Sequence, residues 1–156
     1  MSFYSDIKAI IATIDPSILV VMYNKYRNEA ETQNYTSKVA VIDTNFSDEI
    51  TFGNAGNLLT TSKWQVDFLD LDEWDNFDCD NFNTQSNDSS FEIIENMKLI
   101  ANTTMFRYIA SLDRYFPNAQ PLKWKISGLW RVNSNTMSGV RLVISYQNYS
   151  PIICNP

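Results

Sequence analysis

The stretch SSFEIIENMKLIANTTMFRYIASLDRYFP, Ser89 to Pro117, decides the fold class of this chain. Large apolar side chains recur in it every three or four residues, which places them on one face of an α-helix. Ser89 and Glu92 have the spacing of a capping box, and a proline follows the last apolar position. These apolar positions are Phe91, Ile94, Met97, Ala101, Met105, Tyr108, Leu112 and Phe116. We therefore predict one long amphipathic helix, capped by Ser89 and ended by Pro117.

The segments on both sides of this helix predict a sheet and one further helix. FYSDIKAIIATI, residues 3–14, has helical spacing and is stopped by Pro16. Five other segments are β-branched and aromatic or alternate with a period of two, as strands do, and FGNAGNL at 52–58 has the composition of a turn. The predicted strands are 18–26, 38–43, 63–71, 122–132 and 138–149. The sequence thus predicts an α+β domain over 1–156, in which both helices pack on one face of an antiparallel sheet of about five strands.

Composition indicates a globular chain outside the membrane. The 156 residues are 44% apolar and 13% aromatic, enough for a single hydrophobic core. No run of eighteen apolar residues is present, and the N-terminus lacks the pattern of a signal peptide. Cys79 and Cys154 are too few for a disulfide framework. We expect a soluble protein that is synthesised inside the cell.

Charge is strongly segregated along the chain. Ten acidic and no basic residues lie between Lys63 and Lys98, while the remainder carries eight acids and all twelve bases. The acidic segment therefore has a charge of −10 and the remainder +4, a polarity that affects association more than folding. Its centre, DLDEWDNFDCDNFNTQSND at 70–88, is predicted to be an acidic loop or arm at about 70–89.

Residues suited to catalysis are scarce. Histidine is absent, which excludes histidine-based triads and the common zinc motifs. Cys79 lies between Asp78 and Asp80, whose charges disfavour a reactive thiolate, and Cys154 lies near the C-terminus. Pairs of carboxylates between Asp67 and Asp80 would suit a glycosidase, but so many acids make such a pairing unspecific. We predict a protein without enzymatic activity, cofactor or metal.

Two binding motifs are incomplete. The segment Asn76–Asn87 has oxygen ligands at positions 1, 3 and 5 of a calcium-binding EF-hand loop, but Asn81 and Asn87 stand where glycine and glutamate are required. The sequence GNAG at 53–56 is similar to the loop of an RNA-binding KH domain, without basic flanks. A calcium-dependent monomeric binding module remains the alternative function, and the GNAG segment is more simply a hairpin turn.

The order of elements resembles a known group of proteins. A short helix, a sheet interrupted by a long loop, one long amphipathic helix and a terminal hairpin in SGVRLVISYQNYSPIICNP are similar to the small neck and tail proteins of tailed bacteriophages. These are the tail-terminator, tail-completion and connector-ring proteins, with crAss-like phages among the suggested sources. The resemblance covers most of the chain, rests on element order, and implies no catalytic residues.

This resemblance implies a structural protein of the virion, made in the host cytoplasm. It would form a homo-oligomeric ring of six or twelve copies in the head-tail connector or tail, contacting other neck, tail or portal-proximal proteins. DNA would pass through the channel without specific binding. Charge complementarity between subunits is the expected contact, because a ring joins two different surfaces of its subunit. The residues predicted to bind partners are Asp70, Asp72, Asp75, Lys123, Lys125, Arg131 and Arg141.

Overall fold

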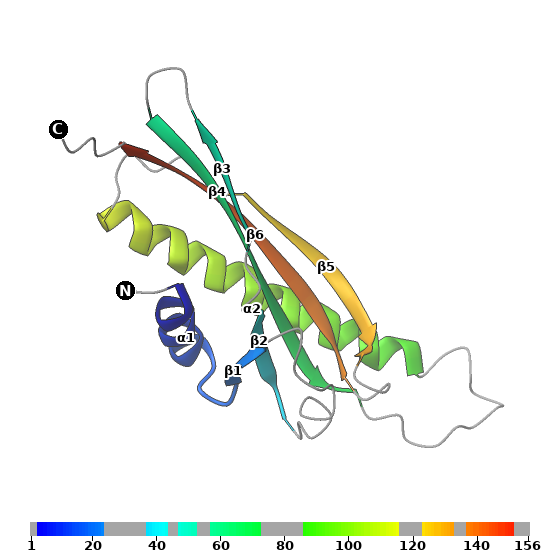
Figure 1. Cartoon of the computed structure of the whole chain (residues 1–156). Coiled ribbons are helices and arrows are strands. Elements are labelled where there is room, and N and C mark those ends of the chain that lie inside the picture. The colour runs from blue at the N-terminus through cyan, green and yellow to red at the C-terminus, as the bar shows by residue number, and fades with distance from the viewer. Residues whose placement is uncertain are drawn as a thin grey trace.

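Two helices and six strands make up the described part of the chain (Figure 1). The computed structural model describes residues 3–23, 37–43, 47–52, 57–72, 86–115, 123–132 and 137–151. In chain order the elements are α1 Phe3–Ile14, β1 Leu19–Tyr23, β2 Val39–Asp43, β3 Ser47–Phe52, β4 Asn57–Leu71, α2 Ser86–Tyr115, β5 Lys123–Arg131 and β6 Met137–Pro151. The fold class is α+β, as the sequence predicts.

The strands form one mixed sheet in the order β1-β2-β4-β6-β5, and β3 also pairs with β4. β4 and β6 are antiparallel along their full length, from Asn57 opposite Pro151 to Leu71 opposite Met137. β2 pairs with the second half of β4, and β3 with the first half of the same edge. The predicted antiparallel sheet is confirmed in outline, because the sheet is mostly antiparallel, but it has six strands where the sequence predicts about five, and β1 and β2 are parallel.

The strand β3 was missed in the sequence because its pattern lacks buried alternation. All six of its residues, SDEITF, are exposed. Together with β4 it flanks residues 53–56, with Phe52 opposite Leu58, so the two strands pair as the predicted hairpin requires. β4 itself begins at Asn57, six residues before the predicted start at Lys63.

The helix α2 covers one face of the sheet, and the long strands β4 and β6 cross in front of it in Figure 1. It begins at Ser86 and not after Ser89, so the predicted cap lies inside the first turns. Its end at Tyr115 agrees with the proline at position 117. The apolar stripe is confirmed by Ile94, Met97, Ala101 and Met105, which are buried in one cluster with sheet residues such as Phe68 and Leu142. Burial of this stripe is the main source of stability for the packing of α2 on the sheet.

The helix α1 has the predicted bounds and lies beside α2. Ile7 and Ile11 are fully buried in the same core, and the ring of Phe3 stacks on that of Trp64 with centroids 4.4 Å apart. On its exposed side, Arg107 Nη1 of α2 donates a hydrogen bond of 2.7 Å to Thr13 Oγ1. The two helices are therefore joined by apolar contacts in the core and by a polar contact on the exposed side.

A polar turn connects α1 to the sheet. Asp15 Oδ1 accepts hydrogen bonds from the backbone N–H of Ser17 (2.9 Å) and from its hydroxyl. Asp15 Oδ2 lies 3.1 Å from Lys38 Nζ, immediately before β2. The hydrogen bonds from Ser17 lower the pKa of Asp15 most, burial opposes them, and the hydrogen bond and charge of Lys38 lower it further. The turn thus fixes the direction in which the chain enters β1 next to β2.

The second face of the sheet is polar except at one end. Side chains there alternate with the core residues, so Lys63, Asp67 and Arg141 point away from the helices. A second, smaller apolar cluster lies at the end of the sheet where β2 pairs with β4. Its buried members are Val39, Val41, Leu69 and Met137. Both faces of β2 are therefore buried, while the rest of this second face presents charge.

Candidate functional site

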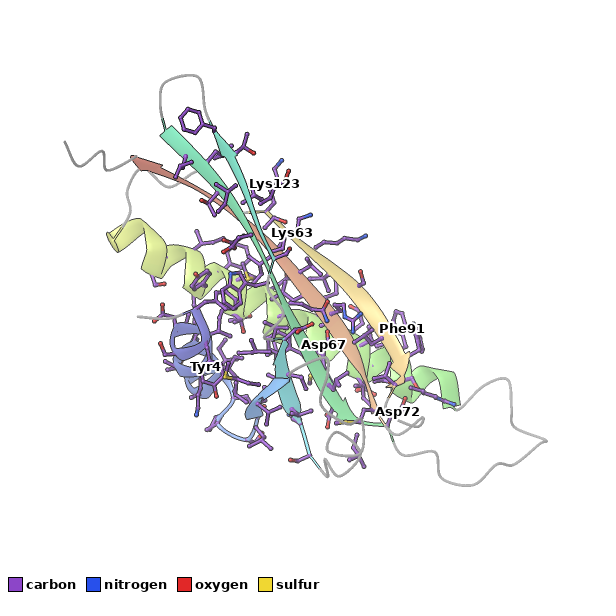
Figure 2. All side chains as sticks on the ribbon, viewed as in Figure 1. Tyr4, Lys63, Asp67, Asp72, Phe91 and Lys123 are labelled. Carbon is purple, nitrogen blue, oxygen red and sulfur yellow. The ribbon has the colours of Figure 1, made fainter. Side chains whose placement is uncertain are left out.

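A buried polar cluster gathers around Asp72, directly after the end of β4. Asp72 is 2% exposed, and Ser90 of α2 and Ser138 of β6 are fully buried. Both hydroxyls donate to Asp72 Oδ2, that of Ser138 at 2.6 Å. Arg131 Nε lies 3.6 Å from the same oxygen, and Arg131 Nη2 donates to Ser90 Oγ at 3.4 Å. One carboxylate thus connects α2, β4, β5 and β6, at the end of the sheet where Figure 2 places Asp72 near Phe91.

The backbone of Arg131 is specialised for this cluster. Its φ of 48° lies in the left-handed region, which costs a non-glycine residue about 1 kcal/mol or more. Its backbone N–H donates to Ser138 Oγ at 3.0 Å, so the serine accepts from Arg131 while it donates to Asp72. The unusual conformation is therefore held by the main chain and the side chain of the same residue.

The cluster is suited to structure and not to catalysis. A serine hydroxyl bonded to a carboxylate could in principle be a nucleophile with its base. Ser90 and Ser138 are, however, completely buried, so no substrate reaches either oxygen. Asp72 Oδ1 is also buried, and it has no hydrogen-bond partner among the residues that the structure describes. A buried carboxylate that accepts hydrogen bonds from two serine hydroxyls and lies beside an arginine is an anchor whose removal is costly.

The polar face of the sheet carries a row of basic residues. Lys63 and Lys123 both lie opposite Ser145, and Lys125 lies opposite Val143. All three lysines are exposed, and Figure 2 shows Lys63 and Lys123 at the same level of the sheet, on the two strands that flank β6. Lys123 and Lys125 of this row are predicted partner-binding residues, and the charges of all three lysines are available to a partner.

An ion pair lies in the middle of the same face. Arg141 Nε and Nη2 donate to the two carboxylate oxygens of Asp67, each at 2.9 Å. The hydrogen bond to Asp67 raises the pKa of Arg141, against the opposing effect of burial, with smaller contributions from the charges of Asp67 and Asp43. Arg141 is therefore neutralised within its own chain.

Exposed apolar side chains gather over two edges of the sheet. On the β5 side, Phe91 and Phe106 of α2 approach Trp130 and Trp124, with ring centroids 6.5 Å and 6.3 Å apart. We call these four residues the aromatic patch; three of them are more than half exposed. On the other side, Ile50 and Phe52 of β3 are 64% and 69% exposed, and we call them the β3 pair. Exposed aromatic groups of this kind are typical of interaction surfaces.

Five of the seven predicted partner-binding residues fall into three groups. Lys123 and Lys125 are exposed. Asp72 and Arg131 are buried against each other, and Arg141 is paired with Asp67, so the structure does not present these charges to a neighbouring subunit. The expectation that Asp72 faces a partner therefore needs correction: its side chain is 1% exposed and points into its own domain.

Other predicted sites fall largely outside the described residues. Asp70 is half-buried and accepts a hydrogen bond from the backbone N–H of Leu71. Asp75, Cys79, Cys154 and nearly all of the candidate calcium loop Asn76–Asn87 lie outside the described residues. Within the described ranges, no three His, Cys, Asp or Glu side chains are grouped as metal ligands would be. Neither described helix is long and apolar enough to span a membrane.

The sequence did contain a signal for the Asp72 cluster. Ser90 lies four residues before Ile94 and so extends the apolar stripe of α2 by a polar residue. A serine on a buried helical stripe needs a hydrogen-bond partner, and the partner is Asp72. No comparable signal exists for the aromatic patch, because the edge position of β5, which carries the half-buried Trp124 and the exposed Trp130, is not visible in local sequence.

Comparison with known proteins gives no assignment: no protein-family model matches the chain, and no curated protein is significantly similar to it.

Proposed function

We propose that this chain is a non-enzymatic structural subunit of a tailed-phage virion, which forms a ring in the head-tail connector or tail around the DNA channel. The observation that carries the proposal is the presence of two different exposed apolar surfaces, the aromatic patch and the β3 pair. Monomeric proteins rarely expose clusters of large apolar side chains. A ring needs two unlike surfaces on each subunit, because each copy contacts its neighbours in a head-to-tail manner.

The distribution of charge supports the same proposal. The exposed row of Lys63, Lys123 and Lys125 lies on one face, while ten of the eighteen acidic residues belong to the segment between Lys63 and Lys98. Complementary charges on different parts of one subunit favour contact between copies and fix their orientation. Acidic side chains facing a channel would also repel DNA phosphates, so that DNA passes without binding.

Native mass spectrometry of the purified protein tests the assembly. We expect a closed ring of six or twelve copies at micromolar concentration, alone or with a neighbouring neck or tail protein. A protein that stays monomeric up to high concentration and with those proteins present would contradict the proposal. Mass spectrometry of purified phage particles tests whether the protein is part of the virion. The chain should be present there in the copy number of the ring.

A charge-reversal experiment tests the contribution of the basic row. The variant with Lys123→Glu and Lys125→Glu should assemble less well than the parent, and high salt should weaken assembly of the parent itself. The matched control carries Lys8→Glu and Lys98→Glu, which reverse two exposed lysines on the helices. If both variants assemble equally well in low salt, the charges of Lys123 and Lys125 do not contribute to the proposed contact.

A further inference from the structure

The two unlike surfaces lie on two strands that each have one free edge. Within the described residues, β3 pairs with β4 alone and β5 with β6 alone. A strand at the edge of a sheet presents a row of backbone donors and acceptors to any chain that can pair with them. Building on the proposed ring, we infer that the free edge of β3 pairs with the free edge of β5 in the next copy, so that one sheet continues across each subunit junction.

Strand direction agrees with this pairing. β3 is antiparallel to β4, β4 to β6, and β6 to β5, so β3 and β5 run in opposite directions within one subunit. A second copy in the same orientation therefore presents its β3 antiparallel to β5. The junction repeats the geometry found inside the sheet, and repeating it head-to-tail generates a ring or a helix of subunits.

The apolar side chains of the two edges lie on the same face of the sheet. Ile50 and Phe52 lie opposite Thr60 and Leu58, which places them on the helix-covered face of β4. Trp124 and Ile126 lie opposite core residues of β6 and so face the same way. With Phe52 opposite Trp124, Ile50 lies opposite Ile126, and the β3 pair covers one end of the aromatic patch. Aromatic and β-branched pairs of this kind stabilise adjacent strands.

The charges on the other face agree with the same register. Glu49 of β3 lies opposite Thr61, on the face that carries Lys123 and Lys125. The register with Phe52 opposite Trp124 brings Thr51 opposite Lys125 and Glu49 diagonally next to it, within reach of a lysine side chain. Lysines on an edge strand discourage unspecific pairing with other strands, but a strand with a correctly placed glutamate can pair because the glutamate neutralises the lysine charge.

The third free edge of the sheet fits less well. β1, LVVMY, also has exposed apolar side chains, Leu19 and Met22. They lie on opposite faces of the strand, since they are three residues apart, and β1 has no acidic residue to meet Lys125. The partner that matches β5 on both faces is therefore β3 of a second copy.

Disulfide cross-linking tests this junction directly. The variant Thr51→Cys with Lys125→Cys is made in a background with Cys79→Ser and Cys154→Ser, and is oxidised mildly after assembly. Within one subunit the two positions are three strand spacings apart, roughly 15 Å at least, too far for a disulfide. A bond can form only between copies, and each copy can form two. We expect a ladder of covalent oligomers up to the full ring on a non-reducing gel, whereas the matched control Thr51→Cys with Lys98→Cys gives none.

A second variant tests the apolar half of the junction. Phe52→Asp should weaken assembly about tenfold or more, while Leu99→Asp, at an equally exposed apolar residue of α2, should leave it unchanged. Thermal unfolding of both variants checks that each subunit remains folded.

The outcomes separate this junction from the ring itself. If native mass spectrometry shows rings but the cross-linked variant gives no ladder, the β3–β5 junction is overturned and the proposed function stands. The same holds if Phe52→Asp assembles as well as the parent. A strictly monomeric parent overturns both. A ladder together with loss of assembly in Phe52→Asp establishes the junction.

Discussion

The two Asp–Arg pairs of this domain have the same chemistry in opposite surroundings. Asp67 and Arg141 lie on the polar face, where two hydrogen bonds of 2.9 Å join them and the arginine side chain is 43% exposed. Asp72 and Arg131 lie inside, with their closest charged atoms 3.6 Å apart and side chains 1% and 15% exposed. The pair with the better geometry is the one that water and salt screen. Burial, more than distance, thus decides how much each pair contributes to stability.

Removing the buried carboxylate should have the largest effect. Asp72→Ala leaves the guanidinium of Arg131 without its carboxylate and removes the acceptor of two buried serine hydroxyls. We expect the free energy of unfolding to fall by about 3 kcal/mol or more, measured by urea denaturation. A loss below about 1 kcal/mol, as for a surface pair, would show that Asp72 is hydrated in solution.

Removing one serine of the cluster should have an intermediate effect. Ser138→Ala takes away a donor to Asp72 and the acceptor of the Arg131 backbone N–H. The expected loss is about 2 kcal/mol, since each buried group left unsatisfied costs energy. Ser127→Ala is the control, because Ser127 lies opposite Arg141 on the polar face. Equal effects of the two substitutions would contradict the distinction between the two environments.

Breaking the Asp67–Arg141 pair, of which the arginine is partly exposed, should have a smaller effect that depends on salt. Asp67→Ala is expected to lower the free energy of unfolding by less than about 1 kcal/mol. The difference from the parent should shrink further near 1 M salt, where charges are screened within about 3 Å. A loss as large as that of Asp72→Ala, unchanged by salt, would mean that the pair is effectively buried.

The ion pair of Asp15 with Lys38 extends the comparison to pH. Its hydrogen bonds to Ser17 and the charge of Lys38 lower the pKa of Asp15 below its ordinary value of 3.8. A lowered pKa stabilises the folded state at pH values above 3.8, and this contribution is lost as pH falls through the folded pKa. Asp15→Asn should therefore make unfolding less dependent on pH below about pH 4, which thermal melts over a pH series would measure. An unchanged acid dependence would place the responsible carboxylates elsewhere.

The sequence was sufficient to predict elements with strong hydrophobic periodicity. It was insufficient for elements whose position depends on the strands they pair with. α1 has the predicted bounds because its apolar stripe and Pro16 both act locally. β3 was missed because an edge strand with every side chain exposed has no burial to impose a pattern. The parallel pairing of β1 with β2 also could not be foreseen, since strand periodicity is the same for both directions of pairing.

The candidate site shows the same division at the level of single residues. Asp72 was assigned to an exposed surface because its neighbours in the chain are acidic. Its burial follows from Ser90, Arg131 and Ser138, which are 18 to 66 positions away. The polar Ser90 on the apolar stripe indicates a buried partner, but local pattern does not identify that partner as Asp72. Lys123 and Lys125, by contrast, alternate with apolar residues along one strand, and their exposure follows from that alternation.

The pairing of β4 with β6 sets the order in which the chain can fold. Their nearest partners, Leu71 and Met137, are 66 positions apart, and all of α2 lies between them. The helix can form locally within about a microsecond, whereas the central ladder must first close this long loop. Any α2 that forms before this closure has no sheet to cover its apolar stripe. During that interval the chain depends on rapid closure of the β4–β6 ladder to avoid aggregation.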